Sequence, residues 1–453
     1  MKRLAVALLL PYAVLTAQTA KLSVPYERVE LRNGLTVILH EDHTIPRVSV
    51  NVWYHAGSAR EKPGRTGFAH LFEHIMFEGS KNVPEGKFDE WLEAAGGDNN
   101  GSTNTDRTNY YENLPSNALD LALFLESDRM GYLLDAMSPG KVDGQRDVVK
   151  NERRQRYENQ PYGMVWIVMA ESLYPAGHPY SWPTIGSMAD LSAASYEDVV
   201  GFFKTYYVPN NASLVIAGDI NVKQAGDAIN QWFGDIPSGK PVEPIDPPAT
   251  FLPAEKRIYM EDRVQLPRLS MAWLTPPLFA PGDAEMDVLA NILAGGKNSR
   301  LYKRLVYEMQ IAQDVSAFQS SATLSSSFWI IVTARAGHTL QEIETVIQEE
   351  LDRIKNADPA DREVQRAINQ FEASFLDGLE TSAQKADQLN NYYVRTGNPD
   401  FFNEDLQRYK AVGPTDIRAV ARTYLSDRER VVLSVVPQGK KELAAAQSNE
   451  VKP

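Results

Sequence analysis

The feature that most constrains the fold of this chain is a pair of short sequences that recur after a proline-rich stretch. Ile45-Pro46-Arg47-Val48-Ser49 recurs as Leu266-Pro267-Arg268-Leu269-Ser270, and Thr205-Tyr206 recurs as Thr423-Tyr424. The two offsets, 221 and 218 residues, are nearly equal, and such self-similarity is typical of a duplicated unit. The alternative is a chance similarity between short strands. The repeat predicts two related domains rather than one large core.

Length and composition place the boundaries of these domains. The 453 residues are too many for one ordinary hydrophobic core. The proline-rich residues 236–254 are predicted to be a linker. We therefore expect an N-terminal domain over 26–235, a C-terminal domain over 255–437 and a disordered polar tail over 438–453.

Residues 1–20 have the pattern of a secretory signal peptide. Met1-Lys2-Arg3 precedes an almost wholly apolar run from Leu4 to Thr16, and small residues follow it up to Ala20. The run is too short for a membrane span, and no second such run follows. The alternative is a buried N-terminal strand, which fits the early basic pair less well. We expect a periplasmic or secreted protein with no stable membrane span.

Composition narrows the class of protein further. With 43% hydrophobic and 23% charged residues, the mature chain is expected to be globular and soluble. A net charge of −13 and only one short basic run argue against nucleic acid as a partner. The chain has no cysteine, which excludes disulfides and a lipid anchor of the bacterial lipoprotein kind.

Hydrophobic periodicity predicts a mixture of strands and helices. Alternating residues around Asn33-Gly34 predict a hairpin over 26–40, and alternation over 47–54 predicts another strand. Helices are expected over the ranges 67–77, 88–95, 115–134, 143–158 and 196–207, and a buried strand over 213–217.

The expected helix at 67–77 contains two histidines and a glutamate among apolar residues. His70 and His74 lie one turn apart, so that both imidazoles can hold one ion, and Glu73 reaches the same space. Two ligands and a free base are what a zinc-activated water needs. H-x-x-E-H is also the inverted form of the zinc-peptidase motif. The alternative is a pair of hydrogen-bonded core histidines with an incidental glutamate.

Several motifs together resemble the pitrilysin/insulinase family of zinc peptidases, above all its shorter, processing-peptidase-like members. The similarity rests on His70 through His74, Arg146 through Glu152, Asn159 through Gly163, His178 through Tyr180 with Thr184 through Gly186, Tyr207 through Asn211, and Ala217 through Asp219. It implies an α+β fold of two homologous domains of the LuxS/processing-peptidase type, each a mostly antiparallel sheet packed with helices. It also implies one zinc ion per chain.

The resemblance also implies roles for residues outside this helix. Glu152 matches the family's third zinc ligand, and we prefer it to the neighbouring Glu78, which would crowd one side of the ion. The segment Asn100, Gly101, Ser102 and Thr103 matches the edge strand that pairs with the substrate backbone, with a polar turn as the alternative. Gln145 stands where many members carry a supporting glutamate, which puts that role in doubt.

One further departure concerns the second domain. Where the family usually carries an arginine and a tyrosine that grip the substrate, this chain has Val306 and Gln313. We therefore expect a zinc metalloendopeptidase with Glu73 as its base, acting on peptides or unfolded segments as the catalytic subunit of a two-subunit enzyme. The partner, a second family subunit, would supply the missing pair. The rival interpretation is a non-catalytic, core-like assembly subunit of the same family, and zinc as a purely structural ion is a third.

Overall fold

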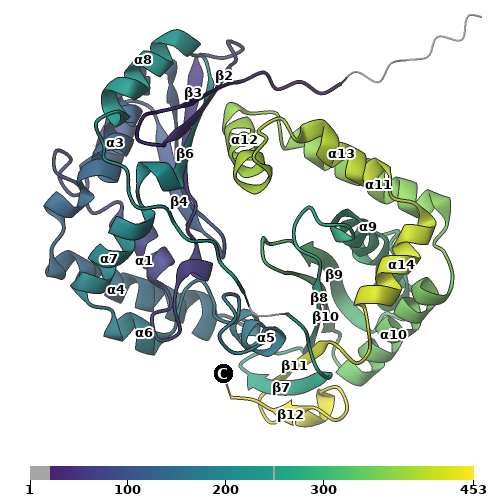
Figure 1. Cartoon of the computed structure of the whole chain (residues 1–453). Coiled ribbons are helices and arrows are strands. Elements are labelled where there is room, and N and C mark those ends of the chain that lie inside the picture. Colours follow the sequence, from purple (N-terminus) through teal and green to yellow (C-terminus); the bar gives the residue numbers. More distant parts are fainter. Residues whose placement is uncertain (1–20, 248–249, 453) are drawn as a thin grey trace, which may run out of the picture.

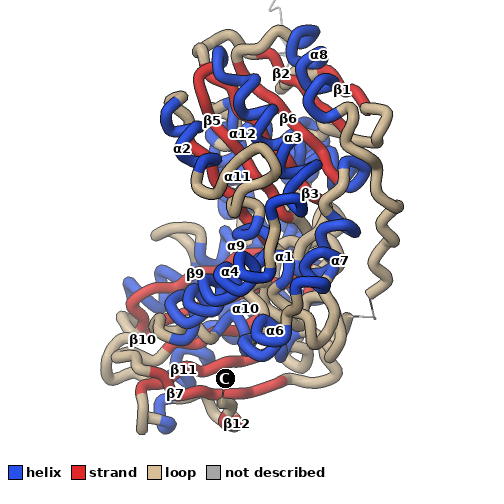
Figure 2. The backbone as a smooth tube through the Cα atoms, turned by 90° about the vertical axis from the view of Figure 1, so that its left-hand side faces the viewer, coloured by secondary structure: helices blue, strands red, loops and turns tan. Residues whose placement is uncertain are grey.

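The computed structural model describes residues 21–247 and 250–452, so the expected signal peptide lies outside the described residues. The described chain forms two halves that face one another (Figure 1), and a quarter turn shows them as two lobes (Figure 2). Each half contains one six-stranded sheet with helices packed against it, which confirms the α+β class. Both sheets are mixed but mostly antiparallel.

The two sheets have the same strand plan. The first has the order β1 (Glu27–Glu30), β2 (Thr36–Glu41), β6 (Ala212–Gly218), β3 (Arg47–Tyr54), β5 (Thr108–Pro115) and β4 (Asp98–Thr103). The second has the order β12 (Asn449–Glu450), β7 (Lys256–Asp262), β11 (Val431–Pro437), β8 (Arg268–Thr275), β10 (Ser326–Ala334) and β9 (Ala312–Ser320). The recurring sequences at Arg47 and Arg268 begin the equivalent strands β3 and β8, so the duplication has a structural counterpart.

The helices also occur in two series. The first half contains α1 (Phe68–Ile75), α2 (Lys87–Ala94), α3 (Leu119–Ala136), α4 (Pro139–Arg153), α5 (Val165–Leu173), α6 (Met188–Ala193), α7 (Tyr196–Tyr206) and α8 (Val222–Phe233). The second contains α9 (Asp283–Ala294), α10 (Leu340–Asn356), α11 (Asp361–Asp377), α12 (Ser382–Thr396), α13 (Phe402–Lys410) and α14 (Pro414–Tyr424). Wider π-helical turns follow α4 and α9, over Arg154–Glu158 and Tyr302–Glu308.

Each half lends one helix to the sheet of the other half. Helix α12 packs on β3 and β6 of the first sheet, where Leu389 and Tyr392 are buried against Val215. Helix α5 packs on β8 and β11 of the second sheet, where Met169 joins a core with Leu433. Burying these apolar faces on the opposite sheet stabilises the pairing of the two halves as well as each half.

A buried ion pair also joins the halves beside strand β4. Asp106, in the turn between β4 and β5, lies 2.8 Å from the guanidinium of Arg395 on α12. The same carboxylate accepts hydrogen bonds from the Tyr180 hydroxyl and from the backbone N–H of Thr323. Both charged side chains are nearly buried, and such a pair is expensive to break because the remaining charge loses its partner.

The hairpin predicted at the N-terminus is confirmed, with β1 antiparallel to β2. The prediction of a disordered tail over 438–453 is wrong for the residues that the structure describes, 438–452. Strand β12 pairs in parallel with β7, and the N–H of Val451 donates to the carbonyl of Tyr259 at 2.9 Å. Ala445 is buried in the second core. A polar composition concealed an edge that β7 leaves open to pairing.

Candidate active site

Helix α1 presents its two histidines from an otherwise buried surface. Phe68, Leu71, Phe72 and Ile75 are buried, while the His70 and His74 side chains keep partial access to solvent. The apolar residues fix the rotation of the helix about its axis because they pack into the core of the first half. The two histidines therefore lie together on the remaining face, which points toward α4.

The start of α1 is positioned by a close packing of backbone and by a buried carboxylate. Gly67 has φ 90°, and a Cβ there would lie 2.9 Å from the carbonyl oxygen of Ile185 and 3.0 Å from Gly186. Glu61 accepts hydrogen bonds from the N–H groups of Gly67 and Ala69 at 2.9 and 2.8 Å. These bonds satisfy donors that a helix start leaves free, and the negative charge suits the helix dipole.

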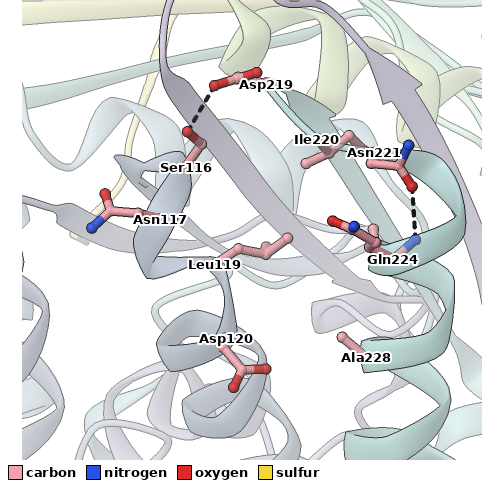
Figure 3. A pocket seen from close by; sticks show the side chains of 10 residues that line it. Ser116, Asn117, Leu119, Asp120, Asp219, Ile220, Asn221, Gln224 and Ala228 are labelled. Atoms are coloured by element: carbon pink, nitrogen blue, oxygen red, sulfur yellow. Dashed lines mark hydrogen bonds between the residues drawn. The ribbon is translucent and has the colours of Figure 1, made fainter.

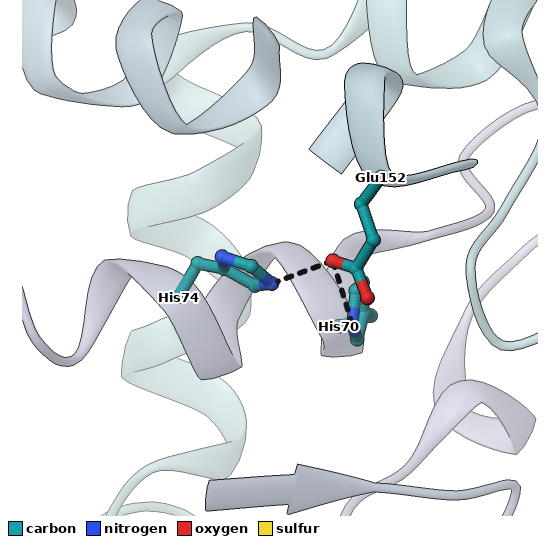
Figure 4. Close-up of side chains that lie close together, drawn as sticks. All are labelled: His70, His74 and Glu152. Atoms are coloured by element: carbon teal, nitrogen blue, oxygen red, sulfur yellow. Dashed lines mark ion pairs between the residues drawn. The ribbon is translucent and has the colours of Figure 1, made fainter. Parts of the chain in front are cut away.

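Glu152 reaches the two histidines from the last turn of α4. Its Oε2 lies 3.2 Å from Nε2 of His74 and 3.7 Å from Nε2 of His70, as Figure 4 shows. Arg153, the next residue, donates to the carbonyl of Gly186 at 2.9 Å, and this bond ties α4 to the loop against which α1 begins. The three residues predicted as metal ligands, 78 positions apart at the extreme, are thus brought together by two packed helices.

The donor set fits a zinc ion. One nitrogen from each histidine and one oxygen from Glu152 all lie within 4.8 Å of one another. Two imidazole nitrogens and one carboxylate oxygen are the ligands of many catalytic zinc sites, which keep a fourth position open. Arg156, one turn beyond Glu152, holds the other carboxylate oxygen at 3.0 Å and leaves Oε2 directed at the histidines. Its role was not predicted, although the i, i+4 spacing to Glu152 would have indicated it.

The electrostatics favour the protonation states that a metal requires. Burial, together with the neighbouring His74, lowers the pKa of His70 to about 4, so its ring is neutral at physiological pH. The hydrogen bond from His74 lowers the pKa of Glu152, so its carboxylate is ionised. Neutral imidazole and ionised carboxylate are the forms that coordinate zinc.

Glu73 lies between the histidines and the edge strand β4. Burial raises its pKa, while a hydrogen bond with Thr103 and the charge of His74 act in the opposite direction. A Cβ on Gly101 would lie only 3.1 Å from Cγ of Glu73, so glycine at this position leaves room for the glutamate. A carboxylate with a raised pKa, near but outside the ligand set, is suited to accept and return a proton.

Strand β4 is the free edge of the first sheet. It pairs only with β5, Gly101 opposite Tyr110 and Thr103 opposite Thr108, so its other side carries unpaired backbone groups. The segment from Asn100 to Thr103 is therefore a strand, and the alternative of a polar turn is wrong. Gly101 and Thr103 face Glu73, which places Asn100 and Ser102 on the opposite face of the sheet.

Two other predicted positions lie away from the ligand atoms. Gln145 donates its amide to Oε1 of Glu78 at 2.6 Å and makes no printed contact with the ligand set in the described structure. Val306 packs against the core of the second half, and Gln313 is exposed at the start of β9. Neither of the last two side chains offers a cation or a phenol.

A hollow of about 260 Å³ on the first half is remote from this centre. Ser116, Asp219 and Asn221 lie around it (Figure 3), just beyond the far ends of β5 and β6. Along β5, Tyr110 opposite Gly101 and Ser116 are separated by six residues, roughly 20 Å of extended strand. This hollow therefore takes no part in the arrangement around His70.

Comparison with known proteins places the chain in a family. Residues 36–169 match the model "Insulinase (Peptidase family M16)", and residues 193–371 match "Peptidase M16 inactive domain". The chain belongs to the pitrilysin/insulinase (M16) peptidase family. The zinc protease PqqE of Helicobacter pylori is 27% identical, over 91% of this chain and 93% of its own. A probable mitochondrial-processing peptidase subunit beta of Arabidopsis thaliana is 23% identical, over 94% and 81%.

The fold agrees with solved structures of the family. The crystal structure of a protease from Helicobacter pylori superposes with a TM-score of 0.84 at 26% identity, covering 92% of this chain and 100% of that one. No helix among residues 21–247 and 250–452 combines the length and the apolar character needed to cross a membrane.

Proposed function

We propose that this M16 chain is a zinc metalloendopeptidase that cleaves peptides or unfolded polypeptide segments. The observation that carries the proposal is the convergence of His70, His74 and Glu152, with Glu73 beside them and a free strand edge next to Glu73. A set kept only for structure would not need a fourth, uncoordinated carboxylate in this place.

The chain's own residues supply binding, orientation and proton transfer. His70, His74 and Glu152 would hold one zinc ion per chain, which when bound supplies Lewis-acid activation of water and of the substrate carbonyl. Outward N–H and C=O groups of β4 would pair with the substrate backbone and hold the scissile bond in register. Glu73 would take a proton from the attacking water and pass it to the departing amine.

We further propose that the active enzyme contains a second family subunit and that the chain is exported. Val306 and Gln313 leave the second half without the arginine and tyrosine that the family resemblance implies, so another chain would have to provide them. The named similarity to a processing-peptidase subunit supports this proposal. The basic and apolar start of the sequence supports a periplasmic or secreted location, which cell fractionation tests directly.

The decisive experiment separates chemistry from metal binding. Glu73→Gln is expected to keep zinc and to lower kcat/KM on peptides by roughly 100-fold or more, because the base is lost. Glu78→Gln is the matched control: this glutamate is also close to His74, but it is bonded to Gln145 and lies outside the ligand set, so its loss should matter much less. Both variants are assayed with the chain alone and with the candidate partner.

The same assays distinguish the rival interpretation. Cleavage that is unaffected by Glu73→Gln would show that this residue is not the base. A zinc-loaded chain without activity, either alone or with a family partner, would instead support the non-catalytic assembly subunit. Strong activity of the chain alone, unchanged by the partner, would show that the missing pair is dispensable.

A further inference from the structure

An aromatic cavity lies where the two halves of the chain meet. Its volume is about 260 Å³, and its walls include Tyr157, Trp166, Tyr174 and Trp182 from the first half and Trp329 from the second. Among the described residues that line it, none carries a charge. The cavity is therefore suited to an apolar group and unsuited to a charged one.

Two of its lining residues connect the cavity to the proposed catalytic centre. Tyr157 is in the π-helical turn that follows Glu152, and the charge of Glu152 acts on its hydroxyl, so the ring is near the ligand set. Thr105 comes two residues after Thr103, the last residue of β4. At about 3.3 Å per residue, the cavity begins roughly 7 Å beyond the part of β4 that faces Glu73.

The indole of Trp166 makes the cavity unusual for a protein surface. This side chain is 48% exposed, although its ring centre lies 5.0 Å from that of Trp329. Trp329 stacks in turn on Phe318 at 6.0 Å, with the rings 8° apart. The N–H groups of Trp329 and Trp182 are bonded to Ser327 and Ser58, so the faces of these rings offer apolar surface.

We propose that this cavity binds a large apolar side chain, aromatic in preference, of the peptide that pairs with β4. The proposal rests on the proposed peptidase function and specifies its substrate class. A peptide added antiparallel to β4 runs toward the cavity in its upstream direction, so the bound side chain belongs to a residue about two positions before the cleaved bond. Tyr157 and Thr105, which adjoin the centre and the strand, make the cavity continuous with the path of such a peptide.

Binding without turnover tests the proposal. Zinc-loaded Glu73→Gln protein is titrated with fluorescent decapeptides that differ at one position, scanned along the peptide, which carries Trp, Leu, Ser or Asp. Fluorescence anisotropy is expected to give a Kd about 10-fold lower for Trp than for Ser at one upstream position, with Leu between them and Asp weakest. Equal Kd values at every position would overturn the proposal.

Two changes in the cavity should remove this preference by opposite means. In the Glu73→Gln background, Trp166→Ser removes a wall, whereas Ala170→Phe fills the space and retains every aromatic residue. Both are expected to reduce the ratio of Ser to Trp Kd values to about 1. Trp232→Ser, a partly buried tryptophan on α8 of the first half and outside the cavity, should leave the ratio unchanged. A preference retained in both cavity variants would overturn the proposal.

Turnover by the protein without the Glu73 change, with its partner, keeps the two proposals separate. Cleavage without any dependence on an apolar upstream residue would reject the cavity as a subsite and leave the peptidase function intact. Aromatic-selective binding without cleavage would reject the peptidase function and leave the peptide-binding site.

Discussion

The two halves of this protein carry the same pair of packed helices, but only one pair has the residues of a metal centre. Helix α9 packs against α11 as α1 packs against α4. Asp287 and Asn291 on α9 lie 217 residues after His70 and His74, and Gln370 on α11 lies 218 residues after Glu152. Asp287, Asn291 and Gln370 surround a hollow of about 230 Å³. The offsets match those of the recurring strand sequences.

The chemistry of the second hollow differs although its scaffold is similar. Asp287 accepts a hydrogen bond from the Tyr409 hydroxyl at 2.6 Å, and burial raises its pKa to about 7. Oδ1 of Asn291 is buried with no hydrogen-bond partner in the described structure. Two helices with the same spacing thus present a strong metal donor set in one half and a weak one in the other. The comparison shows that the fold supplies positions and that a few side chains decide the chemistry.

The largest expected effect is the loss of zinc from the first half alone. His70→Ala with His74→Ala removes both imidazoles, so bound zinc should fall from about one ion per chain to none, together with activity. Asp287→Ala with Asn291→Ala removes the equivalent residues of the second half and should leave the zinc content unchanged. Mass spectrometry of the purified, dialysed proteins measures both. Full zinc occupancy in the first variant would refute the ligand assignment.

Transplanting the ligands would test whether the second scaffold is competent. Asp287→His, Asn291→His and Gln370→Glu together recreate the donor set on α9 and α11, and a second equivalent of zinc is expected, held more weakly than the first. The single change Gln370→Glu is the control and should bind no additional metal. If the triple variant folds but binds no second ion, the helices of the two halves differ in their approach.

A smaller effect should distinguish the two halves by pH. Because the pKa of folded Asp287 is raised to about 7, the folded state retains a proton that the unfolded chain has lost above about pH 4. This contribution to stability is complete below the unfolded pKa and is lost as pH rises through 7. Asp287→Asn mimics the protonated acid, so at pH 8 it should raise the free energy of unfolding by about 2 kcal/mol.

Chemical denaturation at pH 4 and pH 8 measures this difference. At pH 4 the variant and the unmodified chain should be nearly equal, because Asp287 is then protonated in the folded state. Tyr409→Phe is the companion variant, since it removes the hydrogen-bond donor to Asp287 but no charge. A gain of the same size at both pH values would refute the assignment to this proton.

The smallest effect concerns the edge strand beside Glu73. In Gly101→Ala the added Cβ would lie 3.1 Å from Glu73 and 3.2 Å from the Tyr110 ring, so the glutamate has to move by a few tenths of an ångström. A fall in kcat/KM of about 3-fold to 10-fold is expected, with zinc retained. Gly144→Ala on α4, where the structure leaves open space, is the control. Equal kinetics for the two variants would show that Glu73 has more freedom than its packing indicates.

Local sequence by itself determined the secondary structure, the duplication and two of the three ligands. Hairpins, helices and the i, i+4 spacing of His70 and His74 depend on near neighbours, and these elements were confirmed with shifts of a few residues at their ends. The third ligand was identified only through the resemblance to the family, because periodicity alone gives Glu152 the pattern of a solvated helix charge.

Only the tertiary structure decided which distant groups meet. It brings Oε2 of Glu152 to the histidines and directs Gln145 to Glu78 instead. It also exchanges α5 and α12 between the halves and forms the aromatic cavity between Trp166 and Trp329. The reason is physical: spacing along one helix fixes distances within a turn, whereas contacts between elements depend on which apolar faces bury one another, and no local pattern encodes that choice.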